Sequence, residues 1–221
     1  MNIHSTLEKL FHEELYQIAQ SFNYSKENVY ILQNNFTSLK KDFPEIWNSI
    51  ESCVHERDMR SAEEYAKDLV SSWIYEDSVF KYLSKFFDIR LEGGDKHRKI
   101  LNHSKVSSTS DYVIKSNGQE VAIELINSYT NYWKKSQRID LRDNKFTKLR
   151  NDRSILLCVD LFNKEFYVMD LNDKHLKHKY IPFHKPYGKP AYQIDISDIS
   201  IHELTMPKMK DTLNEIVTKE R

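Results

Sequence analysis

Residues 110–126 read SDYVIKSNGQEVAIELI, and this stretch decides how the middle of the chain folds. It contains two apolar runs separated by a polar segment around Asn117-Gly118, which is a favoured turn sequence in β-hairpins. The second run alternates in polarity, which predicts a β-strand paired with the first run. Asp111 and Glu124 would then lie at the same end of the hairpin.

The two acids of this hairpin have the chemistry of a divalent metal site. Strand alternation puts Glu124 on the same face as Ala122 and Ile126, where a carboxylate needs a cation. Mg²⁺ prefers oxygen ligands and usually keeps several waters, so Asp111 and Glu124 on paired strands suit Mg²⁺ or Mn²⁺ that also holds a phosphate. The alternative is a surface hairpin that carries ordinary acids.

A third acid lies on a long helix predicted for residues 62–87, where apolar side chains recur on one stripe. Glu76 falls within this stripe and has no ion-pair partner three or four residues away along the helix. A carboxylate in such a place is costly unless a metal or a hydrogen bond satisfies it. Glu76 is therefore either a further metal ligand or an acid at the edge of the stripe that reaches water.

The remaining apolar patterns predict an α/β core behind a helical N-terminus. Residues 1–60 are typical of two or three helices, and residues 154–160 of a strand buried on both faces. Residues 164–169 would pair antiparallel with that strand, and residues 142–150 have the length of a short helix over the sheet. No linker or repeat divides the chain, so we expect one continuous domain, with a helical subregion followed by an α/β core at residues 61–221.

The composition is that of a folded globular protein, with 221 residues of which 39% are hydrophobic. No apolar run approaches the roughly 18 residues needed to cross a bilayer, so we expect a cytoplasmic protein with no membrane partner. Cys53 and Cys158 lie far apart and predict neither a zinc site nor a disulfide framework. The glycine-rich motifs that cradle phosphates are missing, which argues against a nucleotide-binding loop.

The net charge is zero, but the charges are distributed unevenly along the chain. Residues 1–80 contain 7 Lys/Arg and 14 Asp/Glu, so of the 33 of each kind in the chain, 26 and 19 remain for residues 81–221. Two basic segments, residues 134–153 and 174–189, would follow a phosphate backbone, and nearby tyrosines would pack on sugars or bases. The second segment is also the candidate for base contacts. The alternative is that both segments are solvated faces.

Together these residues resemble the PD-(D/E)XK nucleases. The resemblance rests on an ordered set of short segments, which are Glu76, Gly93-Gly94-Asp95, Ser110-Asp111 and Ile123-Glu124. Residues 121–131 are also similar to the catalytic strand and its exit in a blunt-cutting type II restriction endonuclease. The resemblance covers about residues 70–170 and implies the restriction-endonuclease-like fold, a central mixed β-sheet flanked by helices.

Two positions depart from the pattern of that family. Ser110 stands where the family often has proline, and Ile126 stands where it usually has a lysine that orients or activates the attacking water. The resemblance implies that the helix after the catalytic strand can supply such a lysine, and we favour Lys145. The alternatives are Lys134, Lys135 and Lys148. Any of these lysines would otherwise contact phosphate or solvent.

The resemblance implies a Mg²⁺-dependent endodeoxyribonuclease of the type II restriction kind, which acts on DNA as a homodimer. Asp111 and Glu124 would bind the metal, Glu76 would be a further ligand or position a water, and Lys145 would stabilise the developing negative charge. One alternative is an RNA-cutting relative, such as a viral cap-snatching endonuclease, which would need a histidine ligand such as His55. The other is a degenerate nuclease fold that binds nucleic acid or a protein without cutting.

Overall fold

The computed structural model describes residues 3–54, 60–93, 96–103 and 109–218, so His55, Gly94 and Asp95 lie outside the described residues. The chain forms two compact units, Met1–Val79 with Gly94–Ser107 and Phe80–Gly93 with Ser108–Arg221. Their boundary falls within a long helix, so that helix contributes to both units.

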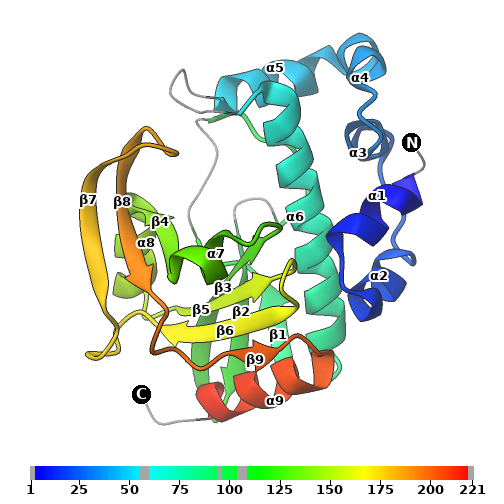
Figure 1. The fold of residues 1–221 in the computed structure, drawn as a ribbon. Helices are drawn as coiled ribbons and strands as arrows, with labels where there is room; N and C mark the ends of the chain where they lie inside the picture. Colours follow the sequence, from blue (N-terminus) through cyan, green and yellow to red (C-terminus); the bar gives the residue numbers. More distant parts are fainter. Residues whose placement is uncertain (1–2, 55–59, 94–95, 104–108, 219–221) are drawn as a thin grey trace. The chain divides into compact units, whose positions relative to one another are not determined.

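The first unit is helical (Figure 1, blue to cyan). Its helices are α1 (Ile3–Leu10), α2 (Glu13–Ala19), α3 (Lys26–Leu32), α4 (Phe36–Asp42), α5 (Pro44–Cys53) and most of α6 (Ala62–Leu83). The segment before residue 60 therefore holds more and shorter helices than the two or three predicted.

Local capping signals explain these short helices. The side chain of Ser25 accepts a hydrogen bond from Asn28 N at the start of α3, and Pro44 occupies the first turn of α5. Ser61 begins α6 with a capping box, because Glu64 N donates to Ser61 Oγ (3.1 Å) and Ser61 N donates to Glu64 Oε2 (2.8 Å). The long helix predicted at residues 62–87 is confirmed, although it ends at Leu83 and turns lead into the first strand.

The second unit contains a six-stranded sheet and a three-stranded sheet. The larger sheet has the order β1 (Asp88–Leu91), β2 (Tyr112–Ser116), β3 (Gln119–Ser128), β5 (Ile155–Asp160), β6 (Glu165–Asp170) and β9 (His202–Glu203). The smaller sheet has the order β4 (Arg138–Arg142), β8 (Lys189–Asp195) and β7 (His178–His184). The helices of this unit, besides the end of α6, are α7 (Tyr132–Ser136), α8 (Asp143–Asn151) and α9 (Met206–Val217).

The larger sheet is mixed, because β3 and β5 run parallel whereas its other neighbouring strands are antiparallel. Strand β5 is buried along its whole length, as expected for a central strand, and β6 is its antiparallel neighbour. Helix α9 packs at the β6–β9 edge and α8 packs on β4 and β8 (Figure 1). The predicted fold class, a central mixed sheet flanked by helices, is thereby confirmed.

The predicted hairpin forms with a tighter turn than expected. Strand β2 continues to Ser116, which pairs directly with Gln119, so the turn consists of Asn117 and Gly118 rather than of six residues. Both turn residues have positive φ, 52° and 77°, as a type I′ turn requires. The turn fixes the register of β2 against β3 and with it the relative positions of the two hairpin acids.

None of the helices in the described part of the chain is long and apolar enough to span a membrane.

Candidate active site

Glu124 lies in the middle of β3 and is only 1% exposed. It pairs in register with Leu156 of β5, and two residues later Ile126 pairs with Cys158. Leu156 and Cys158 belong to the hydrophobic cluster that Phe146 and Leu149 of α8 also join, and Ile126 packs against this cluster. The carboxylate of Glu124 therefore emerges on the sheet face that α8 covers.

Helix α8 brings a cation to this carboxylate. Lys145 Nζ forms an ion pair with Glu124 Oε1, and the Lys145 side chain remains 36% exposed whereas that of Glu124 is 2% exposed. The neighbouring residues Phe146 and Leu149 bury the apolar stripe of α8, which holds Lys145 at the edge of that stripe. The pair thus has one buried carboxylate and one ammonium that still reaches solvent.

The other candidate lysines have different surroundings. Lys134 Nζ bonds to Glu165 Oε1 at 2.7 Å, and Lys148 Nζ bonds to Asp152 Oδ2 at 2.7 Å. Of these three lysines, Lys145 is the one that contacts Glu124. The position of Lys145 also explains why Ile126 can stand where the family usually has lysine. Ile126 lies two residues after Glu124 on the same face and packs against the hydrophobic cluster, while Lys145 of α8 supplies the positive charge.

Asp111 immediately precedes β2 and is held by backbone contacts. The last pair of the β2–β3 ladder joins Tyr112 to Ile123, and one further step of that register puts Asp111 opposite Glu124. Leu125 N donates to Asp111 Oδ2 at 2.8 Å, and Glu92 N donates to Asp111 O at 2.8 Å. The two acids therefore lie at the same end of the hairpin, as predicted, with Asp111 at the entry to β2 and Glu124 on β3.

Ser110, the other departure from the family pattern, has a structural role of its own. Its hydroxyl lies 2.9 Å from the hydroxyl of Ser154, and both residues are buried. Gly93 N also donates to Ser110 O at 2.9 Å. These bonds connect Ser110 to the residue that precedes β5 and to a residue that follows β1. Ser110 thereby restrains the backbone next to Asp111 by hydrogen bonds, where the proline of the family would restrain it by its ring.

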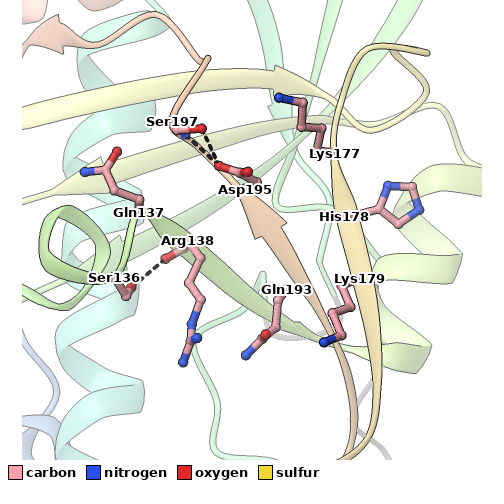
Figure 2. Close-up of a pocket in the computed structure, with 9 residues that line it drawn as sticks. All are labelled: Ser136, Gln137, Arg138, Lys177, His178, Lys179, Gln193, Asp195 and Ser197. Atoms are coloured by element: carbon pink, nitrogen blue, oxygen red, sulfur yellow. Dashed lines mark hydrogen bonds between the residues drawn. The ribbon is translucent and has the colours of Figure 1, made fainter.

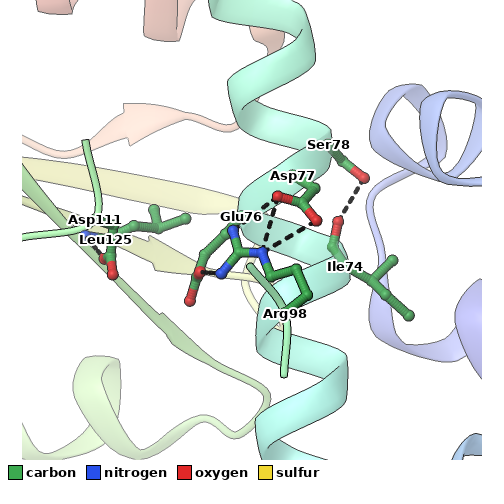
Figure 3. Close-up of polar contacts among 7 residues, drawn as sticks. All are labelled: Ile74, Glu76, Asp77, Ser78, Arg98, Asp111 and Leu125. Atoms are coloured by element: carbon green, nitrogen blue, oxygen red, sulfur yellow. Dashed lines mark hydrogen bonds and ion pairs between the residues drawn. The ribbon is translucent and has the colours of Figure 1, made fainter. Parts of the chain in front are cut away.

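Glu76 belongs to the first unit, on α6, and is 9% exposed. Arg98 Nη1 donates to Glu76 Oε2 at 2.7 Å, while Nε and Nη2 of the same guanidinium bond to Asp77 (Figure 3). An arginine 22 residues further along therefore neutralises the acid that has no partner at helical spacing. The metal-binding role of Glu76 stays a prediction.

Burial and Glu124 also shape the chemistry of Cys158. Burial first, and then the negative charge of Glu124, raise the pKa of the Cys158 thiol well above its usual range. We expect Cys158 to resist iodoacetamide in the native protein even at pH 9, because the thiolate that reacts does not form there. Cys53, whose Sγ lies 3.3 Å from Leu101 O and is partly exposed, is the internal comparison. Mass spectrometry of labelled peptides checks this, and native labelling of Cys158 at the rate of Cys53 would contradict it.

A second polar cluster lies on the smaller sheet and was not predicted. Asp140 Oδ2 lies 3.1 Å from His184 Nε2 and accepts a hydrogen bond from Tyr132 Oη at 2.6 Å, and Tyr187 Oη donates to Asp140 O at 2.9 Å. Burial and then Asp140 raise the pKa of Tyr187, while the positive charges of Arg142 and Lys145 oppose that rise. These contacts join side chains of β4, β7 and the turn between β7 and β8 around one acid.

The donors at the hairpin suit a hard cation. Carboxylate oxygens are ligands that Mg²⁺ prefers, and Asp111 and Glu124 supply two carboxylates at the same end of the hairpin. The ammonium of Lys145 at Glu124 shows that this carboxylate attracts a positive charge. Among the described residues, no group of three or more His, Cys, Asp and Glu side chains is arranged to hold a metal ion.

No family model matches this chain, and no curated protein matches it.

Proposed function

We propose that this protein is a metal-dependent endonuclease that hydrolyses phosphodiester bonds of DNA, with the closest analogy among type II restriction endonucleases. The observation that carries the proposal is the contact of Lys145 with Glu124. The residues that resemble a nuclease motif lack a lysine two positions after Glu124, and helix α8, which comes after α7 and β4, supplies one at the same carboxylate. A buried acid, a neighbouring acid and a partly exposed ammonium are the groups that hydrolysis of a phosphodiester needs.

Each residue has a distinct task in this proposal. Asp111 and Glu124 would hold Mg²⁺, which when bound polarises the phosphate and lowers the pKa of a water. Lys145 would direct its ammonium at the phosphate oxygens, where negative charge develops during in-line attack. Glu124 positions Lys145 through the ion pair, and the apolar cluster beneath Ile126 keeps bulk water away from one side of the pair.

The charge of the smaller sheet supports a polyanionic substrate. Residues Arg138, Asp140 and Arg142 of β4 share a face, because side chains alternate along a strand. Lys179 of β7 lies on that same face, since it pairs with Gln193, which pairs with Asp140. Basic side chains of β4 and β7 therefore stand on one face of the smaller sheet, where they would meet a DNA backbone.

The direct test is incubation of the full chain with long duplex DNA and Mg²⁺ or Mn²⁺, beside an Asp111→Ala control. Discrete fragments would indicate cleavage at defined sequences, and a smear would indicate a nonspecific nuclease. Cleavage of RNA but not of duplex DNA would favour the RNA-cutting alternative. No metal-dependent cleavage of either would leave a module that only binds. Sedimentation with and without DNA tests the homodimer that cutting both strands would use.

Binding to DNA is expected to weaken steeply with salt. Each phosphate neutralised by a lysine or arginine contributes about −0.9 to the slope of log K against log salt, because condensed counterions are released. Charge reversal at Lys174, Lys177 and Lys179 should therefore make the slope shallower by about 1 for each lysine that contacts phosphate. Fluorescence anisotropy with a labelled duplex at several salt concentrations measures this. An affinity that is flat with salt would argue against DNA as the partner.

A further inference from the structure

The smaller sheet has one apolar face and one polar face. Ile139, Leu141 and Ile194 point into the hydrophobic cluster, where Tyr192 stacks on Phe146 of α8 with ring centroids 4.1 Å apart. Strand alternation puts the intervening residues on the opposite face. There the register aligns two rows across the strands, one with Asp140, Gln193 and Lys179 and the other with Arg138, Asp195 and Lys177.

The polar face is hollowed. A hollow of about 450 Å³ lies over these strands and is lined by residues of β4, β7 and β8 and of the segments that flank them. Figure 2 shows the side chains of Arg138, Gln193 and Lys179 pointing to the same side of the sheet, one from each strand. His178 points away from them, because its ring packs on Phe146 beneath the sheet.

The hollow offers uncommitted hydrogen-bonding groups. The side chains of Gln193 and Lys179 form no hydrogen bond or ion pair with the described residues. Arg138 donates from Nε to Tyr132 Oη (2.8 Å), and its guanidinium lies 5.5 Å from the centroid of the Tyr132 ring, which orients the side chain. Three preferred base-reading residue types thus stand next to one another on a rigid support.

An acid in the same hollow argues for base edges rather than phosphate alone. Asp195 accepts hydrogen bonds from Ser197 N (2.9 Å) and Ser197 Oγ (2.7 Å), and these bonds lower the pKa of Asp195. A surface that only bound phosphate would be weakened by an ionised carboxylate. Base edges in the major groove present both donors and acceptors, and cytosine N4 is a donor that a carboxylate accepts.

We propose that this face of the smaller sheet reads base edges in the major groove of duplex DNA, with Arg138, Lys179 and Gln193 as the specificity-determining residues. The proposal rests on the function proposed above, since it names how the same enzyme selects its substrate. The major groove admits a two-stranded ribbon such as the antiparallel β7–β8 pair, which carries Lys179 and Gln193 beside Arg138 of β4. In that groove arginine and lysine pair with guanine, and glutamine pairs with adenine. Among the described residues that line the hollow there is no Phe, Tyr or Trp, so the stacking platform of single-strand binders is missing.

The test selects bound duplexes from a randomised pool and sequences them. The Asp111→Ala background keeps the DNA uncut, and within it we compare the parent, Lys179→Met, Gln193→Glu and the double variant. Matched controls are Lys115→Met and Gln119→Glu, which change the same residue types at exposed strand positions of the β2–β3 hairpin. Circular dichroism and thermal melting of every variant confirm that the fold is retained.

The parent should enrich a defined motif that both hairpin controls reproduce. Lys179→Met and Gln193→Glu should each relax or change the preferred base at one or two positions, with a loss of discrimination of about 5- to 150-fold there, as expected for one bidentate base contact. An unchanged motif in the double variant, a parent that binds without a motif, or uniform loss of binding to all sequences would overturn the proposal. Cleavage of long duplex DNA by the wild-type protein is measured separately. If the protein cuts DNA but enriches no motif, the base-reading role of the smaller sheet is refuted and the proposed nuclease activity is not. If the motif depends on the sheet residues but the protein does not cut DNA, the nuclease activity is refuted and the base-reading role is not.

Discussion

Asp111→Asn is expected to lower cleavage of duplex DNA by at least about 10³-fold, because several kcal/mol of transition-state stabilisation depend on a metal that this carboxylate would hold. The amide oxygen of asparagine can still accept the hydrogen bond from Leu125 N, which is 2.8 Å from Asp111 Oδ2. The fold should therefore survive, and the loss should appear in turnover. Glu124→Gln should have an effect of the same size, for it removes the second carboxylate and the anionic partner of Lys145.

Glu120→Gln is the matched control for these two variants. Glu120 lies on the same strand as Glu124 but is exposed and bonded to Arg90, with 2.6 Å between Glu120 Oε1 and Arg90 Nη1. Its replacement should leave cleavage unchanged. Calorimetric titration with Mn²⁺ gives a second readout, since metal affinity should fall in Asp111→Asn and Glu124→Gln and not in Glu120→Gln. Cleavage at the wild-type rate in either site variant would mean that the acids have been assigned wrongly.

Local sequence signals were sufficient for the hairpin and for its acids. The Asn117-Gly118 turn sets the register by its own backbone preference, and strand alternation then determines which face Glu124 occupies. The buried strand and its antiparallel neighbour also follow from short apolar runs. These features depend on contacts between residues that are close in the sequence, so a single sequence contains the information needed to predict them.

Other parts of the site depend on pairing between distant segments and could not be predicted in this way. The partner of Glu76 is Arg98, which is not at helical spacing and lies beyond the end of α6. Asp140 and His184 meet only because β4 and β7 both flank β8 in a sheet that the residue pattern did not indicate. Gln193 likewise has no distinctive neighbours in the sequence, and only the register with Asp140 and Lys179 reveals its position.

Lys145→Ala is expected to lower kcat by about 10²–10³-fold while changing the Kd for DNA much less, because a cation aimed at developing charge acts mainly in the transition state. A lysine that only contacts phosphate would show the reverse pattern. Lys134→Ala and Lys148→Ala are the controls, since both lysines bond to acids other than Glu124. Lys135→Ala completes the set of candidates. Single-turnover cleavage and anisotropy titrations separate the two quantities.

Lys145→Ala should also lower the free energy of unfolding, and this effect does not depend on catalysis. In Lys145→Ala the carboxylate of Glu124 would remain buried after the loss of the ammonium, which we expect to destabilise the fold by about 1–3 kcal/mol. This cost is smaller than that of breaking a fully buried ion pair, because the lysine side chain is partly exposed. Mg²⁺ should restore part of this loss, because a cation that binds the folded state stabilises it by mass action. Thermal melting with and without Mg²⁺ measures the restoration, and Lys148→Ala should show none. If all four alanine variants cut normally, either the metal alone activates the water or Glu124 has been assigned wrongly. If the wild type is inactive and Ile126→Lys creates cleavage, the chain is a degenerate nuclease that only binds.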